Sequence, residues 1–118
     1  MDKTERYVHK YLYDILTSVR SVKSFLGEKR DFSKFNNNMM MKRAVEREFT
    51  IIGEATNKML KLKPDVKVSH TKKIIGLRNR IVHSYDNITY SLLWEIISID
   101  LPELEKEVLE LLKGTKHV

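Results

Sequence analysis

The spacing of the apolar residues, interrupted by very few prolines and glycines, constrains the fold of this chain most. Only two prolines and four glycines occur in 118 residues, and the apolar residues between them recur at intervals of three and four. That period is typical of amphipathic helices, whereas half-buried strands alternate with a period of two. The sequence therefore predicts an all-α fold.

We expect about five helices in an up-and-down bundle, and a chain of this length fits one domain, residues 1–118. The predicted helices cover residues 4–26, 39–62, 69 to about 84, 88–99 and 102 onward. Gly27 ends the first helix and Pro64 the second. Ser69 is expected to cap the third, and Pro102 to separate the last two. The short connections between the last three helices favour antiparallel neighbours.

Apolar stripes on the two longest predicted helices indicate the core. The stripe of the first helix comprises Tyr7, Tyr11, Leu12, Ile15, Leu16, Val19, Val22, Phe25 and Leu26. That of the second comprises Met41, Val45, Phe49, Ile52, Ala55, Met59 and Leu62. Between these helices, Phe32 and Phe35 should fold back onto the core from a loop, and the run Asn36 to Asn38 offers a helix cap. Gly53 costs about 1 kcal/mol relative to alanine inside a helix, so it predicts close helix–helix packing.

Composition excludes several classes of protein. The chain has no cysteine, so it forms neither disulfides nor thiolate metal sites. We see no signal-peptide pattern at the N-terminus and no apolar run near the roughly 18 residues that span a bilayer. We therefore expect a cytoplasmic protein without a membrane partner. The net charge of +6 favours a polyanionic partner but does not by itself identify one.

Chemistry-bearing side chains concentrate in the stretch from Arg78 to Tyr85. The sequence lacks a phosphate-binding loop, a His-Glu-x-x-His motif, a nucleophile elbow and a carboxylate cluster with metal-ligand spacing. Neither a metal nor a cofactor is therefore expected. Of the four histidines, only His83 lies in a dense polar group, which comprises Arg78, Asn79, Arg80, His83, Ser84 and Tyr85.

Helical geometry limits how this group can assemble. At about 100° per residue, Arg78 and His83 lie roughly 140° apart around a straight helix. The two side chains can converge if the helix ends or bends near His83, which the following Asp86-Asn87 turn allows. Alternatively, they can meet across two chains.

An arginine and a histidine suit transfer of a ribose 2′-hydroxyl to the adjacent phosphate. Histidine moves protons near neutral pH, and an always-charged arginine holds the phosphate oxygens. Asn79 could orient the phosphate or the imidazole, and Tyr85 could stack on a base. The non-catalytic interpretation is that both cations merely complement the helix dipole. Lys72 and Lys73 belong to a basic stretch that is either a solvated loop or a guide for the RNA backbone.

The segment from Arg78 to His83 resembles the signature of the HEPN superfamily. Its extension through Ser84 to Tyr85 resembles the HepT branch, the toxins of the HepT/MNT toxin–antitoxin pairs. Further likeness lies in residues 51–55, 75–79, 92–97 and 101–102. The resemblance implies an all-α homodimer in which the motifs of two subunits face a shared basic cleft.

The resemblance also implies a function and roles for particular residues. The activity would be a metal-independent endoribonuclease without a cofactor, with transfer RNA as the target. The partner would be an MNT-type nucleotidyltransferase antitoxin that attaches AMP to Tyr85. The resemblance assigns catalysis to Arg78 and His83. We further expect Asn79 and Ser84 to support them, and Arg80, Lys72 and Lys73 to bind RNA.

Two questions stay open at this stage. The competing hypothesis is a non-catalytic helical subunit that docks a nucleotidyltransferase and binds nucleotide or RNA. Glu54 matches the family's second-helix segment, and it either reaches the cleft or is an exposed carboxylate that balances nearby lysines.

Overall fold

The all-α prediction is confirmed by the computed structural model, which describes residues 2–83 and 89–115. No strand occurs within those two ranges. The elements in chain order are α1 (Lys3–Leu26), α2 (Phe32–Asn36), α3 (Met39–Leu62), α4 (Thr71–His83), α5 (Tyr90–Glu95), the π-helix η1 (Ile96–Asp100) and α6 (Leu101–Thr115).

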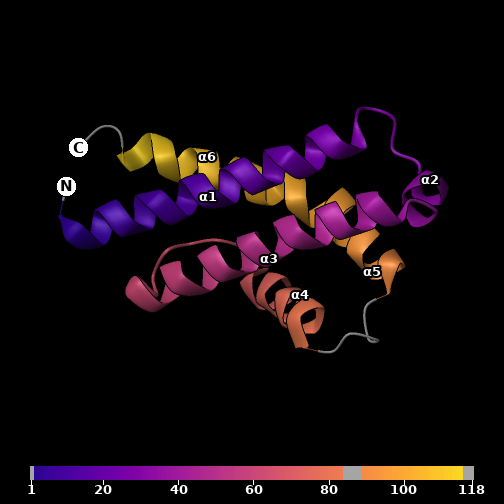
Figure 1. Cartoon of the computed structure of the whole chain (residues 1–118). Helices are drawn as coiled ribbons and strands as arrows, with labels where there is room; N and C mark the ends of the chain where they lie inside the picture. The colour runs from indigo at the N-terminus through magenta and orange to yellow at the C-terminus, as the bar shows by residue number, and fades with distance from the viewer. Residues whose placement is uncertain (1, 84–88, 116–118) are drawn as a thin grey trace.

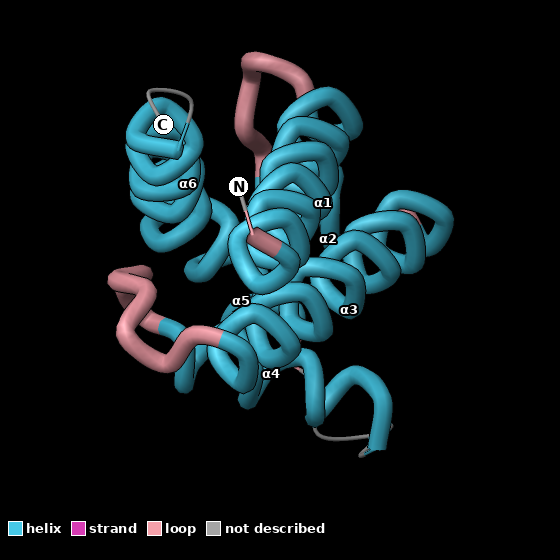
Figure 2. The backbone as a smooth tube through the Cα atoms, turned by 90° about the vertical axis from the view of Figure 1, so that its left-hand side faces the viewer, coloured by secondary structure: helices cyan, strands magenta, loops and turns pink. Residues whose placement is uncertain are grey.

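The long helices pack side by side in the order α6, α1, α3, α4 (Figure 1). Helix α3 returns antiparallel to α1, and α6 runs back along the other side of α1, so that it ends near the start of α1. Viewed at right angles, these helices are seen roughly end-on, with α4 below α3 (Figure 2). This arrangement is an up-and-down bundle, and it places α4 on its outer side.

The core forms where the predicted stripes of α1 and α3 meet the other helices. Its largest fully buried side chains include Leu12, Ile15, Phe49, Ile52, Met59, Ile74, Leu93, Ile96 and Leu104. Three predicted stripe residues, Tyr7, Phe25 and Leu62, are instead at least 40% exposed. They lie near the ends of their helices, where fewer side chains cover them. Among the described residues, no helix is both long and apolar enough to cross a membrane.

The connector between the first two long helices is more ordered than predicted. It contains the single-turn helix α2, whose first turn is capped by Asp31. Phe35 is buried, as expected, and stacks obliquely on Trp94 at a centroid distance of 5.2 Å, whereas Phe32, which was also expected to cover the core, is 36% exposed. The side chain of Asn38 accepts a hydrogen bond from the backbone N–H of Met41 at 3.0 Å, which confirms the predicted cap of α3.

The prediction that Pro102 separates two antiparallel helices is wrong. Helices α5, η1 and α6 follow one another without a loop, and Pro102 is the second residue of α6. The proline is tolerated because a π-helical segment, whose hydrogen bonds span one residue more than those of an α-helix, immediately precedes it. The two predicted helices are therefore joined end to end.

The predicted cap at Ser69 is also wrong. Its backbone N–H and its hydroxyl both donate to the carboxylate of Glu107 on α6, the hydroxyl at 2.8 Å. His70 has a positive φ of 61°, and α4 begins at Thr71. His70 Nε2 also lies within hydrogen-bond distance of Oε2 of Glu103, at 3.1 Å, and Lys73 Nζ forms an ion pair with Oδ2 of Asp100 at 2.8 Å. The start of α4 is thus fixed to η1 and α6.

Candidate active site on helix α4

Arg78 lies where α4 packs closely against Gly53 of α3. A Cβ atom built on Gly53 of α3 would lie 2.3 Å from the Cβ of Arg78 and 2.7 Å from its Cγ, far inside any normal contact. Only glycine can therefore occupy position 53 at this helix separation. The close packing that Gly53 predicts is confirmed. The side chain that occupies the space next to Gly53 is that of Arg78, the candidate catalytic arginine.

Two neighbouring side chains orient the guanidinium of Arg78. One terminal nitrogen, Nη2, lies 3.2 Å from Oε1 of Glu54, and Nη1 donates to Oδ1 of Asn79 at 2.9 Å. The position of Glu54, left open by the sequence, is therefore beside Arg78. Asn79 contacts the arginine directly.

The guanidinium keeps donors available for a further ligand. Arginine has five N–H donors in a planar fork, and two of them are used by Glu54 and Asn79. Nε of Arg78 is buried and finds no acceptor among the described residues. The side chain as a whole remains 24% exposed. An anion that reached the remaining donors would meet a rigidly held, permanently charged group.

His83 is the last residue of α4 and is exposed to solvent. The helix is α-helical without interruption from Thr71 to His83, so no bend brings the histidine round towards Arg78. Arg78 faces α3, and the regular helix directs His83 about 140° away from it. Ser84 and Tyr85, the other two residues of the motif, lie outside the described residues.

The three basic residues implied in RNA binding have different surroundings. The pKa of Lys73 is raised, chiefly by its hydrogen bond to Asp100, so its ammonium is engaged with η1. Lys72 and Arg80 are exposed, and within the described ranges neither forms an ion pair. Both border a cleft of about 220 Å³ between α4 and the α5–η1 run.

A buried polar group holds the start of α5, just beyond the motif. The hydroxyl of Tyr90 donates to Oε2 of Glu46 at 3.1 Å, and Nζ of Lys42 lies 4.1 Å from the centre of the Tyr90 ring. Lys42 and Glu46 are both at most 9% exposed, although neither belongs to the apolar stripe of α3. Burial and the neighbouring carboxylate raise the pKa of Tyr90.

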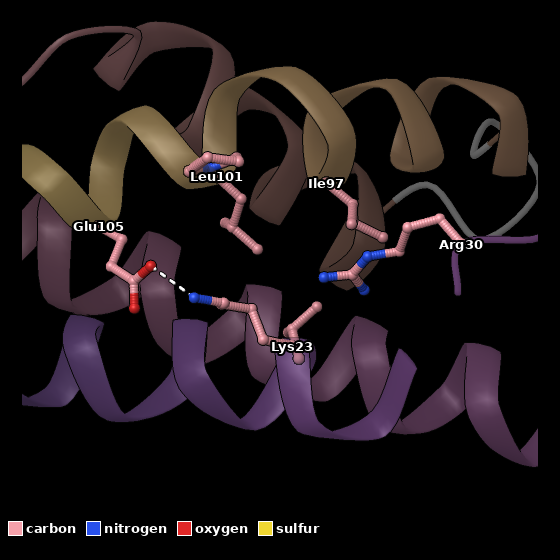
Figure 3. Close-up of a pocket in the computed structure, with 7 residues that line it drawn as sticks. Lys23, Arg30, Ile97, Leu101 and Glu105 are labelled. Carbon is pink, nitrogen blue, oxygen red and sulfur yellow. Dashed lines mark hydrogen bonds and ion pairs between the residues drawn. The ribbon is translucent and has the colours of Figure 1, made fainter. Parts of the chain in front are cut away.

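A second pocket lies away from these residues, between α1 and the η1–α6 junction. Figure 3 shows Lys23 and Glu105 paired across it at 2.9 Å, with the guanidinium of Arg30 directed into the gap. Its volume is about 50 Å³, and it contains no residue of the motif. In the described part of the chain, no group of three or more histidine and carboxylate side chains is arranged to hold a metal ion.

Comparison with known proteins identifies the family to which this site belongs. The family model described as "Ribonuclease HepT-like" matches residues 15–111, which include α3, α4 and the whole motif. This chain belongs to the HepT-like ribonuclease family. No solved structure gives a significant match.

Relatives in this family are similar along most of their length. "Putative RNase MJ1380" of Methanocaldococcus jannaschii is 40% identical over 109 residues, covering 89% of this chain and 96% of that protein. "Putative RNase MJ0125" of the same organism is 31% identical over 117 residues, covering 96% and 97%. "Probable ribonuclease HepT" of Thermococcus cleftensis is 28% identical over 102 residues, covering 82% and 89%.

Sequence reasoning did not identify every residue that shapes the HepT-like site. Gly53 was singled out for packing, but its partner Arg78 was not foreseen. The carboxylates on η1 and α6 that hold the start of α4, Asp100, Glu103 and Glu107, were not singled out. The available signal was their spacing of three and four residues, which places them on one helical face.

Proposed function

We propose that this HepT-like chain is a metal-independent endoribonuclease and the toxin of a toxin–antitoxin pair that acts in the cytoplasm. The observation that carries the proposal is the guanidinium of Arg78, held by Glu54 and Asn79 and with its Nε unpaired among the described residues, in a family of ribonucleases. Arg78 and His83 are the proposed catalytic pair, and transfer RNA is the proposed target.

The proposed reaction uses the 2′-hydroxyl of the RNA as nucleophile. His83 removes its proton, the 2′ oxygen forms a bond to the adjacent phosphorus, and the bond from phosphorus to the 5′ oxygen breaks. The imidazolium returns the proton to the departing 5′ oxygen. Arg78 stabilises the charge that builds on the phosphate oxygens. The products are a 2′,3′-cyclic phosphate and a 5′-hydroxyl end, and no metal takes part.

The direct test is incubation of the purified protein with total transfer RNA in EDTA. Discrete fragments with 2′,3′-cyclic phosphate ends are expected, and His83→Ala should abolish them. His9→Ala on α1 is the matched control and should cleave normally, since His9 lies outside the proposed machinery. Cleavage that persists in His83→Ala would refute the assigned roles. An inert native chain that is also harmless when expressed alone would favour the non-catalytic subunit instead.

We propose a homodimer because Arg78 and His83 diverge on one regular helix. A site made from the arginine of one subunit and the histidine of the other removes that divergence. If inactive Arg78→Ala and His83→Ala proteins are mixed equally and exchange subunits, half of the dimers are mixed. Each mixed dimer has one intact site of two, so about one quarter of native activity should return. A mixture that forms mixed dimers yet stays inactive would rule out this arrangement.

Tyr85 is the proposed point of control by an MNT-type nucleotidyltransferase. AMP on a tyrosine two residues from His83 would add negative charge and bulk where RNA must enter. Intact mass after co-expression with the nucleotidyltransferase should rise in steps of one AMP. Tyr85→Phe should remove the increase, and Tyr13→Phe, which changes an exposed tyrosine on α1, should not. An unchanged mass in the native protein would dismiss the modification.

A further inference from the structure

The cleft between α4 and the α5–η1 run has the lining of a nucleotide-binding groove. Its floor is apolar: Leu92 is half-buried, and Leu77 and Ile96 are buried. Its α4 side carries Lys72, Lys73, Gly76 and Arg80. Gly76 has no atom within 4 Å of the place where a Cβ would stand, so the groove is open at its centre. The volume of about 220 Å³ admits a planar base but is too small for a duplex.

Two of the three cations on this side of α4 have no carboxylate partner within the described residues. Helix α4 contains no acidic residue, and Lys73 is already neutralised by Asp100. Lys72 and Arg80 are left as exposed cations, with no carboxylate partner in the two described ranges. An apolar floor between two such cations fits a ligand with a flat hydrophobic part and flanking anions.

The groove is aligned with His83 rather than with Arg78. Around a regular helix, Lys72 and Gly76 each lie within about 20° of His83, and Arg80 lies about 60° from it. Lys72 is eleven residues from His83, so the row of positions from Lys72 to His83 extends about 16 Å along the helix axis. A strand whose 2′-hydroxyl reached His83 would therefore meet this groove directly as it continued along α4.

From this alignment we infer that the groove binds the single-stranded RNA next to the cleaved bond. Lys72 and Arg80 bind backbone phosphates, and one unstacked base lies against Leu92 on the apolar side of the groove. The substrate must be unpaired here, because a duplex turns its bases inward and offers no face to an apolar floor. The inference rests on the proposed function, which supplies the RNA, and it adds Gly76 as the residue that keeps the subsite open.

The test measures binding separately from cleavage. In the His83→Ala background, fluorescence anisotropy would follow a labelled single-stranded oligoribonucleotide of mixed sequence, with the same sequence as a duplex for comparison. Lys72→Gln and Arg80→Gln should each lower the salt slope of the logarithm of affinity by about 0.7. When the salt concentration rises from about 50 to 200 mM, the affinity of each variant should therefore fall by a factor that is roughly threefold smaller than the factor for the unsubstituted residue. Lys113→Gln on α6 is the matched charge control and should keep the native slope.

The second part of the test fills the groove with a larger side chain at position 76. Gly76→Leu should direct its side chain into the groove, because its Cβ meets nothing, and should weaken single-strand binding by about tenfold. Unchanged single-strand affinity in Gly76→Leu and unchanged salt slopes in both glutamine variants would overturn the subsite. Equal binding of the duplex, or no RNA binding at all, would also overturn it. The proposed function is judged independently, by cleavage of transfer RNA with the native chain.

Discussion

Gly53→Ala should disturb the site and the fold together. The new methyl would lie 2.3 Å from the Cβ of Arg78 and 2.7 Å from its Cγ, whereas carbon atoms pack at about 3.5–4.0 Å. Because Cβ is fixed to the backbone, α3 and α4 must separate by roughly 1 Å. Such overpacking costs about 1–3 kcal/mol, against a gain of about 1 kcal/mol from replacing a helical glycine.

Gly76→Ala provides the matched control for stability, because it gives the same helical gain without a contact. The free energies of unfolding of the two variants should therefore differ by about 1–3 kcal/mol in urea titrations followed by circular dichroism. At roughly 4 °C per kcal/mol, the midpoints of thermal unfolding should differ by about 4–12 °C. If Gly53→Ala were as stable as Gly76→Ala, the reasoning on the α3–α4 contact would be refuted.

The same substitution should slow RNA cleavage by about a hundredfold, the usual consequence of moving a reacting group by 1 Å. Gly114→Ala on α6, where a Cβ also meets nothing, is the activity control. The stability penalty of Gly53→Ala should vanish in an Arg78→Gly background, which removes both atoms that the methyl meets. It should persist in Arg78→Ala, which retains the Cβ. Equal penalties in the two backgrounds would place the clash elsewhere.

Three further predictions concern the buried and paired polar groups. Glu54→Ala should slow cleavage more than Glu54→Gln, which can still accept a hydrogen bond from Arg78. Neither should change the free energy of unfolding by more than about 1 kcal/mol, because this pair is partly exposed. Tyr90→Phe should lower that free energy by about 1–3 kcal/mol by leaving Glu46 unpaired. The pKa of Tyr90 is raised in the folded state, so the stability of the native protein should be retained below pH 10 and fall above it. Unfolding measured as a function of pH should show this fall, and Tyr90→Phe should reduce it. Asp100→Asn should cost about 1–3 kcal/mol in urea unfolding; an unchanged midpoint would mean that its ion pair is not stabilising.

The features predicted well from sequence were those set by local pattern. The period of the apolar residues identified the helices, and Asn38 caps α3 because its side chain acts on its own backbone neighbours. Gly53 was expected to mark close packing, since few other reasons keep glycine inside a helix. Which side chain fills the space depends on how α3 and α4 are placed relative to one another, and a single sequence does not contain that register.

The features that were missed depend on distant partners. Ser69 has the local chemistry of a cap, but Glu107, 38 residues further on, accepts both of its donors. Pro102 has the local chemistry of a break, but the π-helical turn before it carries the helix through. Glu54 was left open for the same reason, because its partner lies on another helix.

The attachment of α4 along its length bears on how the enzyme would meet its substrate. Ser69, just before α4, is held by Glu107, Lys73 is held by Asp100, and Arg78 lies against Gly53. Contacts with three elements, α6, η1 and α3, therefore fix the rotation of α4 about its axis. A helix fixed in this way is preorganised: its side chains do not have to turn towards a phosphate when charge develops. The RNA must supply the conformational change, and the target would be selected by how readily its strand unstacks to follow a rigid surface.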